Sequence, residues 1–104
     1  MESMVKVELA GKTVEVTLTG KLDAVKAPEL MEEFKKLIGN QIDKIIFRAS
    51  ELEYISSAGL RTIIFAKQKI GMDAEIFLEG AQESVLEVIQ MSGLDNFLTI
   101  SEKV

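Results

Sequence analysis

The chain opens with two short segments in which apolar and polar residues alternate. Residues 4–10 read MVKVELA and residues 13–19 read TVEVTLT. A period of two is typical of strands with one buried face, and the Gly11-Lys12 pair between the segments fits a tight hairpin turn. The pattern therefore predicts an antiparallel hairpin with two sets of inward-facing residues: Val5, Val7 and Leu9 in one strand, and Val14, Val16 and Leu18 in the other.

A helical pattern follows the interruption of this alternation at residues 20–23. Its apolar residues recur at intervals of three and four: Ala27, Leu30, Phe34, Leu37 and Ile38. This spacing predicts a helix with one apolar face that ends near Gly39-Asn40. Asp23 is a candidate cap for the first turn, where Pro28 is also tolerated because early helical N–H groups lack partners.

The second half alternates between strand-like and helix-like segments. Residues 44–49 (KIIFRA) form a nearly continuous apolar run, typical of a strand covered on both faces. The later segments are a strongly apolar helix from Leu60 to Ile70, a strand at 74–78, a helix at 82–92 that ends at Gly93, and a short strand at 97–100. The order ββαβαβαβ predicts an α/β fold with a mostly parallel sheet, right-handed crossovers, a leading hairpin and helices packed on the sheet.

The composition removes several classes of function. The 104 residues include 17 acidic and 12 basic side chains, with a net charge of −5, and neither histidine nor cysteine. A Ser/His/Asp hydrolase, a thiol enzyme and a zinc cluster all need residue types that the chain lacks. An acidic chain is also poorly suited to nucleic acid, whose phosphates attract clustered lysine and arginine. We therefore expect a protein that is not an enzyme and has no cofactor, no metal and no nucleic-acid partner.

No repeat, linker or low-complexity tract divides the chain, so residues 1–104 are expected to form a single domain. No apolar run approaches the ~20 residues that cross a bilayer. The segment Met1-Glu2-Ser3-Met4 lacks the basic and apolar stretches of an export signal. The sequence therefore predicts a cytoplasmic protein without membrane insertion.

Small residues gather in the segment from Tyr54 to Arg61, which reads YISSAGLR. A sharp turn into a helix at this place points the first helical N–H groups outward, where they attract anions. The carboxyl ends of parallel strands are also where open α/β sheets bind ligands and partners. A serine hydroxyl displayed there is well placed to be modified.

A purely structural interpretation fits the same residues. Serine is among the best N-cap residues, so Ser56 or Ser57 would accept a bond from a backbone N–H group. Gly59 would permit close packing of helix and sheet, Asp23 would cap a helix, and Arg61 would be a solvated surface residue.

Two stretches of the chain resemble a known family. GKLDAVKAPEL at residues 20–30 and SELEYISSAGLRTIIFA at residues 50–66, with their separation, resemble the STAS domain, the sulfate transporter and anti-sigma factor antagonist family, in its short stand-alone bacterial form. The leading hairpin, the helix order and SGLDNFLTI at residues 92–100 also match the family layout. The resemblance thus covers nearly the whole chain.

The resemblance implies an anti-sigma factor antagonist, a phosphoprotein that acts by partner switching in transcription regulation. It binds an anti-sigma factor serine kinase while its turn serine is unmodified and is released when the kinase phosphorylates that serine; a serine phosphatase is a further implied partner. The family acceptor lies two residues before the turn glycine, which places it at Ser57. The implied partner-binding residues are Asp23, Ser56, Ser57, Ala58, Gly59, Leu60 and Arg61.

Three positions depart from the family pattern. Related sequences commonly carry aspartate before the acceptor and often serine or threonine after it, where this chain has Ser56 and Ala58. They frequently carry aspartate or asparagine at the position of Arg48. Ser56 in place of aspartate removes a negative charge beside the acceptor and supplies a second hydroxyl.

Two other functions remain open at this point. The first is a constitutive STAS interaction or adaptor subunit in which Ser56 and Ser57 are only capping residues, an interpretation that the missing aspartate favours. The second is an enzyme or a domain that binds a nucleotide or another anion, although the chain has neither the glycine-rich loop and lysine of P-loop enzymes nor a dense acidic metal cluster. Glu51 and Glu53 are expected to be exposed loop carboxylates.

Overall fold

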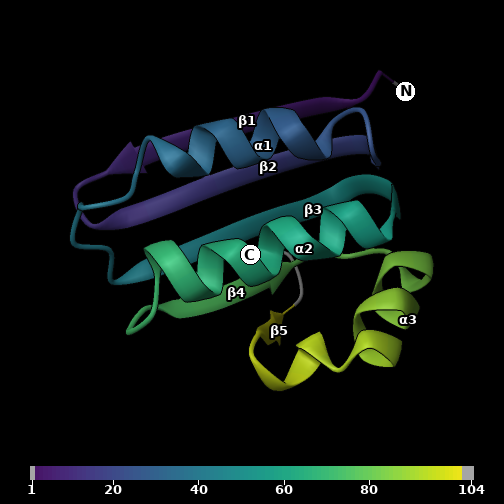
Figure 1. The fold of residues 1–104 in the computed structure, drawn as a ribbon. Helices are drawn as coiled ribbons and strands as arrows, with labels where there is room; N and C mark the ends of the chain where they lie inside the picture. Colours follow the sequence, from purple (N-terminus) through teal and green to yellow (C-terminus); the bar gives the residue numbers. More distant parts are fainter. Residues whose placement is uncertain (1, 102–104) are drawn as a thin grey trace.

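Five strands and three helices make up the fold in a computed structural model that describes residues 2–101 (Figure 1). The strands are β1 (Met4–Ala10), β2 (Thr13–Leu22), β3 (Lys44–Ile55), β4 (Glu75–Glu79) and β5 (Thr99–Ser101). The helices are α1 (Ala27–Lys35), α2 (Ser57–Phe65) and α3 (Glu83–Ser92), with a π-helical turn at Ala66–Ile70 after α2 and a 3-10 turn at Leu94–Asn96 after α3. The predicted order ββαβαβαβ is confirmed.

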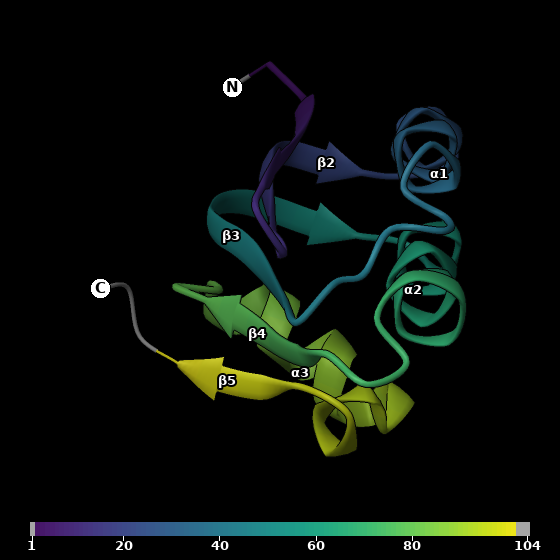
Figure 2. The ribbon, with the colours of Figure 1, turned by 90° about the vertical axis from the view of Figure 1, so that its left-hand side faces the viewer.

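The strand order places all three helices on one face of the sheet. The strands lie in the order β1-β2-β3-β4-β5, with β1 antiparallel to β2 and every later pair parallel. The crossovers through α1, α2 and α3 each lead to the next strand in the same direction across the sheet. Because such crossovers are right-handed, their helices lie on the same side of the sheet. Figure 2 shows the sheet nearly edge-on, with α1 and α2 against that side. Within residues 2–101 the opposite face carries no helix, and we call it the open face.

This arrangement corrects the expectation that residues 44–49 are covered on both faces. Ile45 and Phe47 are fully buried against the helices, whereas Lys44, Ile46 and Arg48 alternate with them on the open face and are half-buried. The apolar Ile46 made the run look continuous, but the strand order leaves its side of the sheet without a covering helix.

The core lies between the sheet and the helices. Val14, Val16 and Leu18 of β2 are buried as predicted. Phe34 of α1 meets Phe47 of β3 edge-to-face, with 6.2 Å between ring centroids. Other large buried side chains are Leu22, Leu30, Ile45, Leu52, Ile63, Leu78 and Ile89. No helix among residues 2–101 has both the length and the apolar character needed to span a membrane.

Strand β2 continues through the predicted break and ends at Leu22. Gly20 makes this possible because it adopts a φ of +67°, which other residues rarely tolerate. A Cβ at Gly20 would lie 2.6 Å from the Ser3 hydroxyl oxygen, and that hydroxyl accepts a bond from the Lys21 N–H group at 2.9 Å. Gly20 therefore lets β2 pass close to Ser3 and continue to Leu22.

Strand β3 is also longer than predicted and ends at Ile55. Its pairing with β2 shifts twice, between Thr17 and Thr19 and between Gly20 and Lys21, and each shift gives β3 one extra residue. Such bulges destroy the alternation of buried and exposed residues. Glu51 and Glu53, expected in a loop, are exposed as predicted but lie on this strand.

The predicted boundaries of α1 and β5 are also wrong. Helix α1 ends at Lys35, and the next turns bond three residues back, as from the Leu37 N–H group to the Phe34 carbonyl at 2.9 Å. This tighter winding rotates Ile38 off the core face, and it is 51% exposed. Phe97 lies outside the last strand because its N–H group closes the 3-10 turn on Leu94 at 2.9 Å.

Candidate functional site

The ends of β2 and β3 bring Asp23 and the serine turn together. The pairing register sets Leu22 opposite Ile55, so the residues that follow, Asp23 and Ser56, leave the sheet at the same edge. The Ser56 N–H group donates to the Leu22 carbonyl at 2.9 Å, and its hydroxyl donates to the same oxygen at 3.2 Å. Both candidate segments of the sequence therefore meet at one place.

Ser56 and Ser57 have different roles in this turn. Ser56 is the N-cap of α2, since its side-chain oxygen accepts a bond from the Gly59 N–H group at 3.2 Å. Ser57, predicted in the turn before the helix, is instead the first residue of α2, which begins three residues earlier than the predicted Leu60 because Ser56 caps it, and Ser57 is exposed. Its hydroxyl has no hydrogen-bond partner within residues 2–101. The structural interpretation thus holds for Ser56, whereas Ser57 is exposed and makes no capping bond.

The helix cap does not require the aspartate that the family resemblance led us to expect at position 56. Aspartate and serine are both strong N-caps. Ser56 therefore retains the capping bond to Gly59 while it removes one negative charge from the neighbourhood of Ser57.

Gly59 allows α2 to begin directly against the sheet. A Cβ at this position would lie 2.7 Å from the Leu22 carbonyl oxygen and 2.8 Å from a side-chain carbon of Ile55. No larger residue fits there without a shift of the helix. Leu60 is half-buried against the core, and Arg61 is exposed. Of the predicted contact residues, Ser57 and Arg61 are thus the exposed members, and they lie one helical turn apart.

Asp23 holds the turn that precedes α1. Its Oδ1 atom accepts bonds from the N–H groups of Val25 at 3.0 Å and Lys26 at 3.1 Å. These donors, Lys26 first and then Val25, lower the pKa of Asp23 below its usual value of 3.8. The helix itself begins later, with Lys26 as its N-cap and Pro28 in the first turn. Asp23 therefore carries a negative charge at the same edge of the sheet as the serine turn.

A groove of about 360 Å³ runs between α1 and α2 and reaches the serine turn. It is lined by Ala24, Ala27, Pro28, Met31, Glu32, Lys35, Ala58, Arg61 and Thr62. Ala58 and Arg61 belong to the predicted partner-binding residues, and the other lining residues were missed. The three alanines were the available clue in the sequence, because short side chains leave a gap between packed helices.

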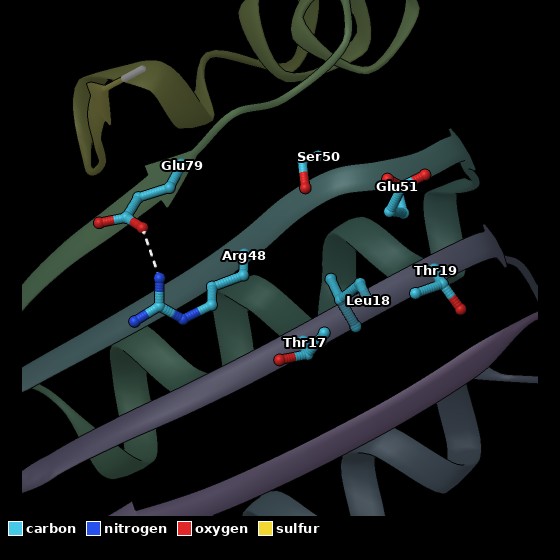
Figure 3. A pocket seen from close by; sticks show the side chains of 7 residues that line it. All are labelled: Thr17, Leu18, Thr19, Arg48, Ser50, Glu51 and Glu79. Carbon is cyan, nitrogen blue, oxygen red and sulfur yellow. Dashed lines mark hydrogen bonds and ion pairs between the residues drawn. The ribbon is translucent and has the colours of Figure 1, made fainter. Parts of the chain in front are cut away.

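Arg48 lies on the open face of the sheet, beside Glu79 (Figure 3). Its Nε and Nη2 atoms donate to Glu15 Oε1 at 3.0 and 2.8 Å, and its Nη1 atom donates to Glu79 Oε1 at 2.9 Å. The hollow of about 170 Å³ beside it is lined by Thr17, Leu18, Thr19, Ser50 and Glu51 as well. Because two carboxylates already neutralise the guanidinium, Arg48 ties β2, β3 and β4 together and is a poor anion site.

Known structures share this fold at low sequence identity. An anti-sigma factor antagonist from Mycobacterium paratuberculosis is similar with a TM-score of 0.81 and 20% identity, over 96% of this chain and 86% of that chain. The Bacillus cell fate determinant SpoIIAA in the phosphorylated form gives 0.74 and 19%, over 93% and 90%. A sulfate transporter family protein from Wolinella succinogenes gives 0.74 and 13%, over 93% and 82%. These likenesses establish the fold.

Sequence comparison supplies the family. No curated protein matches the chain. A family model, however, described as the STAS domain, matches residues 4–104 and so includes the hairpin, the serine turn and the groove. The chain therefore belongs to the STAS domain family.

Proposed function

We propose that the protein is an anti-sigma factor antagonist that binds a partner protein, and that phosphorylation of Ser57 switches the binding off. The observation that carries the proposal is the division of roles at the turn, where Ser56 caps α2 and Ser57 is exposed beside it. The fold likeness supports it, because the similar structures include the anti-sigma factor antagonist SpoIIAA in an unphosphorylated form and SpoIIAA in a phosphorylated form.

The chemistry in this proposal is performed by the partner. An anti-sigma factor kinase transfers the γ-phosphoryl group of ATP to Ser57 Oγ: the new O–P bond forms as the bond to ADP breaks, and a base of the kinase takes the hydroxyl proton. A serine phosphatase removes the phosphate by hydrolysis, which restores the hydroxyl and releases inorganic phosphate. The protein itself needs only an accessible hydroxyl on a stable scaffold, and ATP as the phosphate donor places the exchange in the cytoplasm.

Local energetics allow the modified protein to stay folded. A phosphate adds about −1.5 to −2 charges. At the start of α2 it faces unpaired N–H groups, where a negative charge is worth ~0.3–1 kcal/mol. Arg61 lies four residues after Ser57, the spacing that sets side chains on the same helix face. The phosphate is therefore accommodated within the domain.

The complex is affected in the opposite direction. A partner that covers Ser57 must remove water from the phosphate, and the loss of water strengthens the repulsion between the phosphate and acidic groups such as the Asp23 carboxylate, which is ionised at neutral pH. Desolvation and repulsion of a dianion cost several kcal/mol. A penalty of ~4 kcal/mol corresponds to about a thousandfold in affinity. Binding can thus be switched while the fold persists.

Variants at Ser57 test the proposal against the cognate anti-sigma factor kinase. We expect the native chain and Ser57→Ala to bind alike and Ser57→Asp to lose most of its affinity. Ser57→Asn is the matched control, because its side chain has nearly the size of the one in Ser57→Asp without the negative charge, and it should bind like Ser57→Ala. If Ser57→Asp binds within about twofold of the native chain, less than 0.5 kcal/mol, the switch is wrong.

A constitutive adaptor is the second candidate. The observation in its favour is Ser56 itself, which caps α2 without the negative charge that related sequences carry beside the acceptor. An adaptor would bind its partner equally well as the native chain, Ser57→Ala and Ser57→Asp, and incubation with ATP and kinase would leave its mass unchanged.

A further inference from the structure

We propose that strand β1 pairs antiparallel with β1 of a second copy of this chain, about a two-fold axis at Val7. β1 (Met4–Ala10) is the outermost strand and pairs only with β2 within residues 2–101. Figure 1 shows it along the outer edge of the sheet. It has seven residues, whereas β5 at the other edge has three. A long free edge is a template for another strand, and proteins usually blunt it.

The free backbone groups of this edge belong to Val5, Val7 and Leu9. The turn between β1 and β2 has two residues, so the residues that flank it, Ala10 and Thr13, form a hydrogen-bonded pair. Bonded and non-bonded pairs alternate along an antiparallel ladder. The even-numbered residues of β1 therefore bond to β2, and the odd-numbered residues direct their N–H and C=O groups away from the sheet.

The charges on β1 select one register. If the free groups are to meet over at least five residues of β1, the two-fold axis must pass through Lys6, Val7 or Glu8. An axis at Lys6 or Glu8 sets like charges opposite each other, which is unfavourable. An axis at Val7 sets Lys6 opposite Glu8 of the second copy, twice by symmetry, and pairs all seven residues of the strand.

Both charged side chains are exposed enough to exchange partners. Lys6 Nζ and Glu8 Oε1 form an ion pair of 3.9 Å within β1, but the side chains are 60% and 62% exposed, and such a surface pair is weak. Lysine alone on an edge strand repels a second copy. Glu8, two residues after Lys6, lies opposite Lys6 of the second copy in this register, so the two edges attract each other.

The face of β1 toward the helices has apolar residues available for the same pairing. Val5 and Val7 are only partly buried, and Leu9 is 41% exposed. The Val7 axis sets Leu9 of the second copy opposite Val5. Beside Val5 lies a surface cavity of about 330 Å³ lined by Glu29, Glu32 and Glu33. Each of these glutamates is ion-paired with a lysine of its own chain, which reduces repulsion of a second copy.

The proposed dimer is independent of the serine switch. Ser57 follows β3, which is two strands in from the paired edge, so each copy keeps its turn accessible.

Charge exchange tests the register in the full chain by sedimentation equilibrium. The native chain should form a reversible dimer. Lys6→Glu and Glu8→Lys should each weaken it by about tenfold or more, because two attractive pairs become repulsive. An equimolar mixture of the two variants should associate again as a heterodimer, because every cross-strand pair is then complementary. Lys69→Glu makes the same charge change at an exposed residue elsewhere and should leave the dimer unchanged.

Amide hydrogen exchange then identifies the strand. The amides of Val5, Val7 and Leu9 should gain protection as concentration rises, while those of Lys6 and Glu8 are protected throughout. Val7→Pro removes a free N–H group without loss of a bond to β2, and should prevent association with the circular dichroism spectrum retained. A native chain that stays monomeric at millimolar concentration, a dimer that Lys6→Glu leaves intact, or a mixture that does not associate overturns the proposal.

Discussion

Replacement of Ser56 by alanine should destabilise the fold measurably. The change removes the acceptor of the Gly59 N–H bond, at 3.2 Å, and the hydroxyl donor to the Leu22 carbonyl, also at 3.2 Å. Loss of an N-cap serine costs about 1 kcal/mol, within a range of ~0.5–2. The Leu22 carbonyl keeps its bond from the Ser56 N–H group at 2.9 Å, so the second loss adds little. We expect a decrease of about 1–2 kcal/mol in the free energy of unfolding.

Ser57→Ala is the matched change one residue later. It removes an exposed hydroxyl at the first helical residue, where alanine is a good helix former, so the free energy of unfolding should stay within about 0.5 kcal/mol of the native value. Urea and thermal unfolding measure both variants, and 1 kcal/mol corresponds to ~4–8 °C in Tm for a domain of this size. An equal or larger loss for Ser57→Ala would refute the assignment of Ser56 as the cap.

Three other changes test the surrounding contacts. Gly59→Ala should cost about 1–3 kcal/mol in urea unfolding, because its Cβ would lie 2.7 Å from the Leu22 carbonyl oxygen; a neutral result would contradict this close approach. Asp23→Ala should lower the free energy of unfolding at neutral pH. The difference in this free energy between the variant and the native chain should become smaller as the pH falls below 3.8. The reason is that the folded state lowers the pKa of Asp23, so the stabilisation by its carboxylate is complete above the unfolded pKa and is lost as the pH falls through the lower folded pKa; a difference that does not change between neutral and acid pH would argue against it. Arg48→Met should cost about 1 kcal/mol, and less in ~1 M salt, where screening weakens ion pairs; a loss that salt does not change would exclude the ion pairs as its cause.

The sequence was sufficient for features set by local periodicity. The hairpin, the order of elements and the inward faces of β2 and α1 all follow from spacings of two, three and four residues. Gly93 also ends α3 as predicted, with a φ of +81°. Such features depend on neighbours along the chain, which the sequence lists directly.

Features that depend on strand register could not be predicted in the same way. Ser56 and Ser57 are equally good caps, and the long-range bond from the Ser56 N–H group to Leu22 decides between them. The bulges of β3 disrupt the alternation of buried and exposed residues at 50–55, so the sequence pattern did not predict a strand there. The open face depends on the order of the strands in the sheet. The ion pairs of Arg48 likewise join it to Glu15 and Glu79, which lie 33 and 31 positions away along the chain.

Phosphorylation of the native chain by the cognate anti-sigma factor kinase tests the central claim most directly. After incubation with ATP, intact-mass and peptide analysis should locate one phosphate on Ser57 in both the native chain and Ser56→Ala, and none in Ser57→Ala. A phosphate on Ser56, or an unmodified native chain beside an active kinase, would contradict the claim that Ser57 is the switch.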